Sequence, residues 1–97
     1  MNVIWTAKAF KALDAIFDSI AEKSVTSAHK TVNAILDREN QLITQPKSGT
    51  IENRLKLKRE YRFLVEGHYK IIYRIGAKSI YVVKVFDTRQ NPKKINK

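Results

Sequence analysis

Basic side chains are the residues of this sequence whose type and spacing suggest chemistry most directly. They recur through the second half of the chain, at Arg59, Arg62, Lys70, Arg74, Lys84 and Arg89. Guanidinium and ammonium groups bind phosphate and carboxylate oxygens, and they stabilise the negative charge that develops on a phosphate during its transfer. These positions therefore predict a face that binds an anionic target, either as a docking surface or as part of a nuclease site.

The charge of the chain is concentrated in the same region. Residues 1–53 contain six Lys and Arg against six Asp and Glu, whereas residues 54–97 contain thirteen against three, which accounts for the whole formal net charge of +10. A concentrated positive surface attracts polyanions, so nucleic acid, a ribosome and an acidic protein are the expected classes of partner. The alternative is that the lysines only keep a small domain soluble.

Several kinds of site are excluded by what the sequence lacks. There is no cysteine for a disulfide or a thiolate metal site, and His29 has no second histidine or carboxylate at ligand spacing. Glycine-rich phosphate loops and serine or cysteine nucleophile motifs are also missing, so we expect neither a metal nor a cofactor. Because the sequence has no long apolar run and its first residues do not resemble a signal peptide, we expect a cytoplasmic protein without a membrane partner.

The first half of the chain predicts a strand followed by two helices. Residues 2–5 form a short apolar run, and Thr6 stands where the N-cap of a helix belongs. A helix is predicted over residues 7–23. A second one is predicted to begin near residues 24–27 and to end in the polar segment of residues 45–50, which contains Pro46 and Gly49. Their apolar stripes follow a helical period and consist of Phe10, Leu13, Ile16, Phe17 and Ile20, then Ala28, Val32, Ile35, Leu36 and Leu42.

The second half predicts strands, because the period of apolar residues changes to two after Leu57. Strands are expected at residues 61–66, 69–75 and 80–86, with turns at Gly67 and at residues 76–78 and an irregular tail from residue 87. The expected fold class is α+β: an N-terminal strand, a two-helix hairpin and a three-stranded antiparallel meander. With only 97 residues, we expect one domain over residues 1–97.

The two helices are expected to cover one face of the sheet. The alternation of residues along the strands predicts that the other face carries both cations and apolar groups. The cations are Arg62, Lys70, Arg74 and Lys84, and the apolar groups between them are Leu64, Ile72, Val82 and Phe86. Like charges side by side destabilise a sheet unless an anion is bound there. Such a mixed face favours a docking surface over an ordinary solvated one, although charged strands also deter aggregation.

The order of these segments resembles a known family over nearly the full length. The stretches that carry the resemblance are VIWT at residues 3–6, REYRFLV at residues 59–65, HYKIIYRI at residues 68–75 and DTRQNP at residues 87–92. They are similar to recurrent phrases of the RelE/ParE superfamily, the toxins of bacterial type II toxin–antitoxin systems. The resemblance implies a cytoplasmic toxin that a cognate antitoxin neutralises with an acidic or amphipathic segment.

The superfamily includes both poisons of DNA gyrase and ribosome-dependent messenger RNA endonucleases, so the fold does not decide the target. In a nuclease, Lys70 would stand where the members carry a basic residue, and Arg62, Arg74 and Arg89 would crowd the same phosphate. The sequence offers no clear pair of residues to act as the acid and the base in RNA cleavage. The nucleases place a Tyr or His after the last strand, where this chain has Asp87 to Gln90.

The remaining candidates for proton transfer are Glu60 as base, His68 or Tyr69 as acid, and a lysine with a lowered pKa. Each has an ordinary alternative, because His68 suits a turn and Glu60 suits an ion pair with Arg59 or Arg62. The sequence therefore favours a non-enzymatic toxin that binds gyrase. An endoribonuclease is the alternative, and a simple nucleic-acid-binding module is a third.

Overall fold

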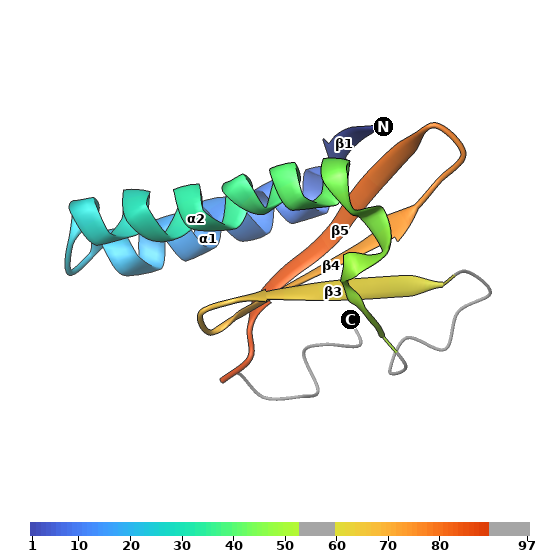
Figure 1. The fold of residues 1–97 in the computed structure, drawn as a ribbon. Helices are drawn as coiled ribbons and strands as arrows, with labels where there is room; N and C mark the ends of the chain where they lie inside the picture. Colours follow the sequence, from blue (N-terminus) through green and yellow to red (C-terminus); the bar gives the residue numbers. More distant parts are fainter. Residues whose placement is uncertain (53–59, 90–97) are drawn as a thin grey trace.

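The computed structural model describes residues 1–52 and 60–89, and it confirms the predicted α+β order of elements (Figure 1). A short strand precedes two helices, and an antiparallel meander of three longer strands follows. The elements are β1 (Asn2–Trp5), α1 (Ala7–Ala21), α2 (Val25–Thr44), the 3-10 turn η1 (Pro46–Ser48), β2 (Thr50–Ile51), β3 (Tyr61–Glu66), β4 (Tyr69–Ile75) and β5 (Ser79–Asp87).

Both helices begin at a side-chain cap, and the cap at Thr6 is the one that the sequence predicts. The Thr6 hydroxyl accepts a hydrogen bond from the Ala9 backbone N–H at 3.2 Å, and the Ser24 hydroxyl accepts one from Ser27 at 3.1 Å. These bonds satisfy N–H groups that the first turn of a helix leaves without a partner. Within the described ranges, neither helix combines the length and apolar character that a membrane span needs.

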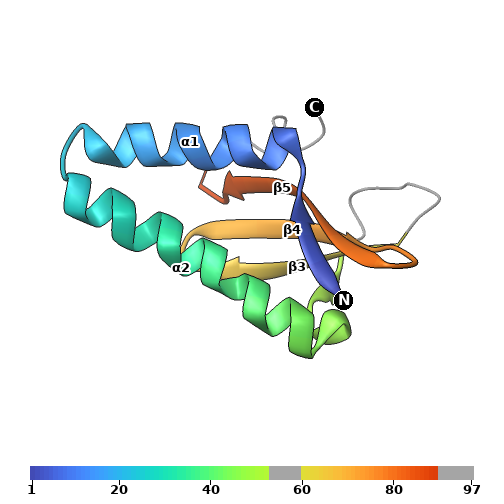
Figure 2. The same ribbon diagram turned by 90° about the horizontal axis from the view of Figure 1, so that it is seen from above.

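The helices lie on one side of a five-stranded sheet, and α1 packs beside β5 (Figures 1 and 2). The strand order is β1-β5-β4-β3-β2, with β1 parallel to β5 and the other pairs antiparallel. The short β2, where Thr50 pairs with Phe63, was not predicted from the sequence. It adds an edge strand that places the following residue, Glu52, beside the outer face of the sheet.

The core lies between the helices and the sheet, as predicted. Leu13, Ile35 and Leu42 from the helices meet a layer of sheet residues that includes Ile71, Tyr73, Ile80 and Val82. Burial of these apolar side chains is the main source of stability. Phe10, expected in the apolar stripe of α1, is instead 52% exposed and lies with its ring centroid 6.4 Å from that of Trp5.

The predicted division of residues between the sheet faces is wrong for Arg62. The turn between β3 and β4 has two residues, Gly67 and His68, and a φ of 59° at Gly67 suits such a hairpin. This turn pairs Arg62 with Tyr73 and Leu64 with Ile71. Cross-strand partners share a face, so Arg62 and Leu64 lie on the helix side and not with Lys70.

A β-bulge corrects the prediction for the last strand as well. The register between β4 and β5 shifts at Ile72 and Tyr73, so that Ile72 pairs with Lys84 whereas Tyr73 pairs with Val82. A bulge inserts one residue and reverses which side chains of a strand face the core. Val82 therefore belongs to the core, and Lys84 lies on the outer face.

Candidate functional site

Lys70 lies at the centre of the outer sheet face, where its ammonium group is held by internal contacts. It forms an ion pair with Glu52, and the two side chains are only 7% and 3% exposed. The same ammonium lies 3.9 Å from the ring centroid of Phe63 on the neighbouring strand. A cation over an aromatic face is attracted by the ring quadrupole. Lys70 is therefore part of the packing of the sheet and does not present its charge to solvent.

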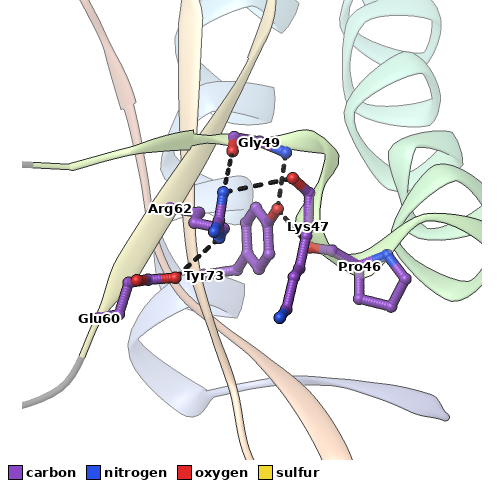
Figure 3. A network of polar contacts seen from close by, with 6 residues as sticks. All are labelled: Pro46, Lys47, Gly49, Glu60, Arg62 and Tyr73. Atoms are coloured by element: carbon purple, nitrogen blue, oxygen red, sulfur yellow. Dashed lines mark hydrogen bonds and ion pairs between the residues drawn. The ribbon is translucent and has the colours of Figure 1, made fainter.

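Arg62 holds the chain after α2 against the sheet (Figure 3). Its Nη1 donates to the Gly49 carbonyl at 2.9 Å and to the Lys47 carbonyl at 3.3 Å. Its Nε donates to Oε2 of Glu60 at 3.0 Å, which confirms the predicted ion pair between these residues. Carbonyl groups at a helix end need such donors, so Arg62 fixes the segment that carries Lys47.

Tyr73 completes the same network from β4. Its hydroxyl donates to the Pro46 carbonyl at 2.6 Å and accepts from the Gly49 N–H at 2.9 Å (Figure 3). Burial raises the pKa of the Tyr73 phenol, and the hydrogen bond from Gly49 and the charge of Arg62 oppose that rise. The phenol is therefore a neutral structural group at physiological pH.

Arg89 and Asp87 form a pair at the end of β5, far along the strand from the Arg62 network. Nη2 of Arg89 lies 2.7 Å from Oδ2 of Asp87, and the Asp87 carboxylate also accepts from the Arg89 N–H at 2.9 Å. The hydrogen bonds from Arg89 lower the pKa of Asp87 against the opposing effect of burial. Asp87 is thus held as a carboxylate where the nucleases carry a Tyr or His.

His68 and Tyr69 lie near this pair but take up structural roles. The His68 carbonyl accepts hydrogen bonds from the backbone and the hydroxyl of Thr88, at 2.8 and 2.9 Å, so this residue serves a turn, as the sequence suggested. Burial and the charge of Asp87 raise the pKa of the Tyr69 phenol, whereas Arg89 lowers it. A raised pKa makes Tyr69 a weaker acid than an ordinary tyrosine.

Two further predicted cations, Arg74 and Lys84, lie on the outer face. The guanidinium of Arg74 stacks on the ring of Tyr81, with its Cζ atom 4.3 Å from the ring centroid. Burial lowers the pKa of the Lys84 ammonium, and the charge of Lys8 adds to that effect. Arg74 is at one end of the face, Arg89 lies beyond the other end, and Arg59 lies outside the described residues. The predicted cations therefore do not form one common patch.

One group of cations does converge, around a cavity of about 500 Å³ at the end of β4. Its charged lining comes from Lys47, Arg62 and Arg74, together with the carboxylate of Glu60, and the rest from Ile75, Gly76 and Ala77. Lys47 was not singled out from the sequence, because nothing there shows that Arg62 draws the end of α2 toward the sheet. The cavity lined by these residues is called the cationic cavity.

Glu52 was also missed by sequence reasoning. Its only signal was an acidic residue close to a strand of two residues, which is too short to recognise by alternation. The described residues contain no group of three or more His, Asp or Glu side chains placed to hold a metal ion. Among the described residues, the place where several basic residues line one cavity is therefore the cationic cavity.

Comparison with known proteins identifies the family of this chain. Residues 3–92 match the family model described as the ParE toxin of the type II toxin–antitoxin system parDE. No curated protein sequence matches the chain significantly.

The solved structures that share the fold include two from toxin–antitoxin systems. A chain of the chromosomal ParDE toxin–antitoxin system from P. aeruginosa is 23% identical, with a TM-score of 0.74 over 90% of this chain and 95% of that one. A chain of the toxin–antitoxin complex RelBE2 from Mycobacterium tuberculosis is 18% identical, with a TM-score of 0.61 over 89% and 95%.

Proposed function

Because the chain belongs to the family of ParE toxins of type II toxin–antitoxin systems, we propose that it inhibits growth by binding a macromolecular machine, with DNA gyrase as the target. It acts in the cytoplasm, without a cofactor and without cleaving a substrate itself. The formal net charge of +10 suits neutralisation by a cognate antitoxin that contributes an acidic or amphipathic segment.

The observation that carries this proposal is the buried ion pair of Lys70. In the nucleases that the sequence resembles, a basic residue on this strand stabilises the charge that develops on the scissile phosphate. Such stabilisation requires a donor aimed at the reacting oxygen. The Lys70 ammonium is instead directed to Glu52 and enclosed by Phe63. This arrangement argues against a role for Lys70 in cleavage and favours a toxin that acts by binding.

The two carboxylates that could act as a base are also held by ion pairs. Glu60 receives the Nε donor of Arg62, and Asp87 is bound to Arg89. A general base must be free to take the proton of a substrate hydroxyl, and its pKa should lie near the working pH. The lowered pKa of Asp87 moves it away from that value. Neither carboxylate therefore fits the role of base in RNA cleavage.

Purified toxin tested on both machines distinguishes the proposal from its alternative. We expect it to inhibit supercoiling by gyrase and to trap gyrase on cut DNA, while messages in a translating extract stay intact. Addition of the protein encoded by the neighbouring antitoxin frame should restore supercoiling. Messages cut at defined codons in the ribosomal A site, with gyrase unaffected, would overturn the proposal.

An endoribonuclease remains the second candidate, because Arg74 and Lys84 keep positive charge on the outer sheet face. In that case Lys70→Ala and Arg89→Ala should each abolish cleavage, and cleavage that survives both changes would remove these assignments. A simple nucleic-acid-binding module would show neither activity, and its affinity for DNA would fall steeply with salt.

A further inference from the structure

The cationic cavity has an excess of positive charge that the described residues do not balance. Three cations line it, Lys47, Arg62 and Arg74, and one carboxylate, that of Glu60. Glu60 pairs with Arg62. In the described parts of the chain, neither Lys47 nor Arg74 forms an ion pair with an Asp or Glu. Cations that converge on one cavity repel each other unless an anion joins them.

The two arginines are held in place before any ligand binds. Arg62 is fixed by hydrogen bonds to two backbone carbonyls and to Glu60. Its side chain is only 17% exposed. The guanidinium of Arg74 lies over the ring of Tyr81, with Cζ 4.3 Å from the ring centroid, and this contact restricts its position. Side chains ordered in advance lose less entropy on binding.

An apolar cavity adjoins the cationic one and shares two of its walls. It measures about 590 Å³ and is lined by Met1, Gln45, Pro46, Lys47, Ser48 and Ile75. Lys47 and Ile75 belong to both cavities. A ligand that fills both therefore needs an anionic group attached to a larger organic group, which can lie against Pro46 and Ile75.

We propose that the cationic cavity binds a phosphate monoester whose organic group extends into the apolar cavity, as in a nucleoside 5′-monophosphate or the 5′-phosphorylated end of a nucleic acid strand. Three cations against one carboxylate leave an excess of two positive charges. A phosphate monoester carries roughly −1.5 to −2 near neutral pH, whereas a carboxylate carries only −1. The planar forks of two arginines also match phosphate oxygens. The site is independent of which machine the toxin inhibits.

Titration calorimetry on the full chain at low salt tests the proposal with five probes. These are inorganic phosphate, a nucleoside 5′-monophosphate, the same nucleoside without phosphate, and a dinucleotide with or without a 5′-phosphate. We expect the monophosphate to bind at least about tenfold more tightly than either of its parts. A preference for the phosphorylated dinucleotide over the monophosphate would identify a strand end as the natural ligand, and the reverse would identify a free nucleotide.

Substitutions place the binding at the cavity. Lys47→Gln and Arg74→Gln should each lower the affinity for the monophosphate by about tenfold, which is the usual effect of losing one charged hydrogen bond. Lys11→Gln is the matched control, because it removes the same charge from an exposed position on α1, outside the cavity. Amide signals of Ile75, Gly76 and Ala77 should shift on binding. Arg62 is left unchanged because its substitution would release the segment around Gly49.

Three results would overturn the proposal. One is equal binding of the nucleoside with and without phosphate. Another is an equal loss of affinity in Lys11→Gln and Lys47→Gln, which would show that only the overall charge matters. The last is an acidic peptide that binds more tightly than the monophosphate and displaces it, which would make the cavity a docking site for protein.

Discussion

Lys70 and Glu52 form an ion pair on the outer sheet face, although strand β3 and the turn after it lie between the two residues along the chain. Their side chains are 7% and 3% exposed. Desolvation of two charges offsets much of their attraction, so such a pair adds little net stability while both members are present. The pair affects the free energy of unfolding mainly when one of its two members is replaced.

Replacement of Lys70 alone should therefore be strongly destabilising. We expect Lys70→Met to lower the free energy of unfolding by about 3–5 kcal/mol, because it removes a buried cation from beside the buried Glu52 carboxylate. The double variant Lys70→Met/Glu52→Met should recover most of that loss. Urea unfolding of the single and double variants measures both values, with Lys11→Met as the control for an exposed lysine. Simple addition of the two single effects would contradict the pairing.

The Tyr73 hydroxyl should matter for stability in spite of its small size. Tyr73→Phe removes the donor to Pro46 and leaves the Gly49 N–H buried without its acceptor. An unsatisfied buried polar group costs about 1–3 kcal/mol. Thermal unfolding should reveal this loss, and Tyr81→Phe is a suitable control, since the contact described for Tyr81 uses its ring. A Tyr73→Phe protein as stable as the native one would show that water replaces both bonds.

Gly49 should resist substitution because the space around it is occupied. A Cβ at this position would lie 2.5 Å from the Tyr73 hydroxyl oxygen and 2.7 Å from the Phe63 carbonyl oxygen. We expect Gly49→Ala to displace the segment after α2 and to weaken any ligand binding at the cationic cavity. Gly67→Ala is an informative comparison, since nothing lies within 4 Å of its Cβ and only its φ of 59° is unfavourable. It should cost about 1–2 kcal/mol without affecting the cavity.

Stability should decline at alkaline pH. Burial raises the pKa of Tyr73 and of Tyr69 above the ordinary value of 10.0, so the folded chain keeps protons that the unfolded chain releases. This contribution is complete below pH 10.0 and is lost as the pH rises through the folded pKa. Unfolding in urea between pH 8 and pH 12 measures the slope, which is at most about 1.4 kcal/mol per pH unit for each tyrosine. Tyr73→Phe should reduce it, and an unchanged slope would exclude Tyr73 as its source.

The elements themselves could be predicted because local signals define them. Thr6 and Ser24 each offer a hydroxyl at a helix start, and both cap the helices that follow. The change of apolar period after Leu57 indicates strands, and the meander is found where that alternation predicts it. Signals of this kind depend only on neighbours along the chain.

The contacts across strands could not be predicted in the same way. A turn of two residues aligns Arg62 with Tyr73, and the bulge beside Ile72 places Val82 and Lys84 on opposite faces of the sheet. A shift of one residue moves every following side chain to the opposite face. Glu52 reaches Lys70 only because of the edge strand β2, which has two residues. The positions of the basic side chains depend on these details of register. The sequence therefore identifies the basic residues but does not show which of them lie together.

The parallel pairing of β1 with β5 has a consequence for synthesis. The first strand, Asn2–Trp5, pairs with residues 79–82, which are among the last of the fold to be made. Contacts between distant parts of a chain close late in folding. The ribosome must therefore make the chain through β5 before β1 can pair and the sheet can be completed, so this domain cannot reach its final fold until its last strand has been made.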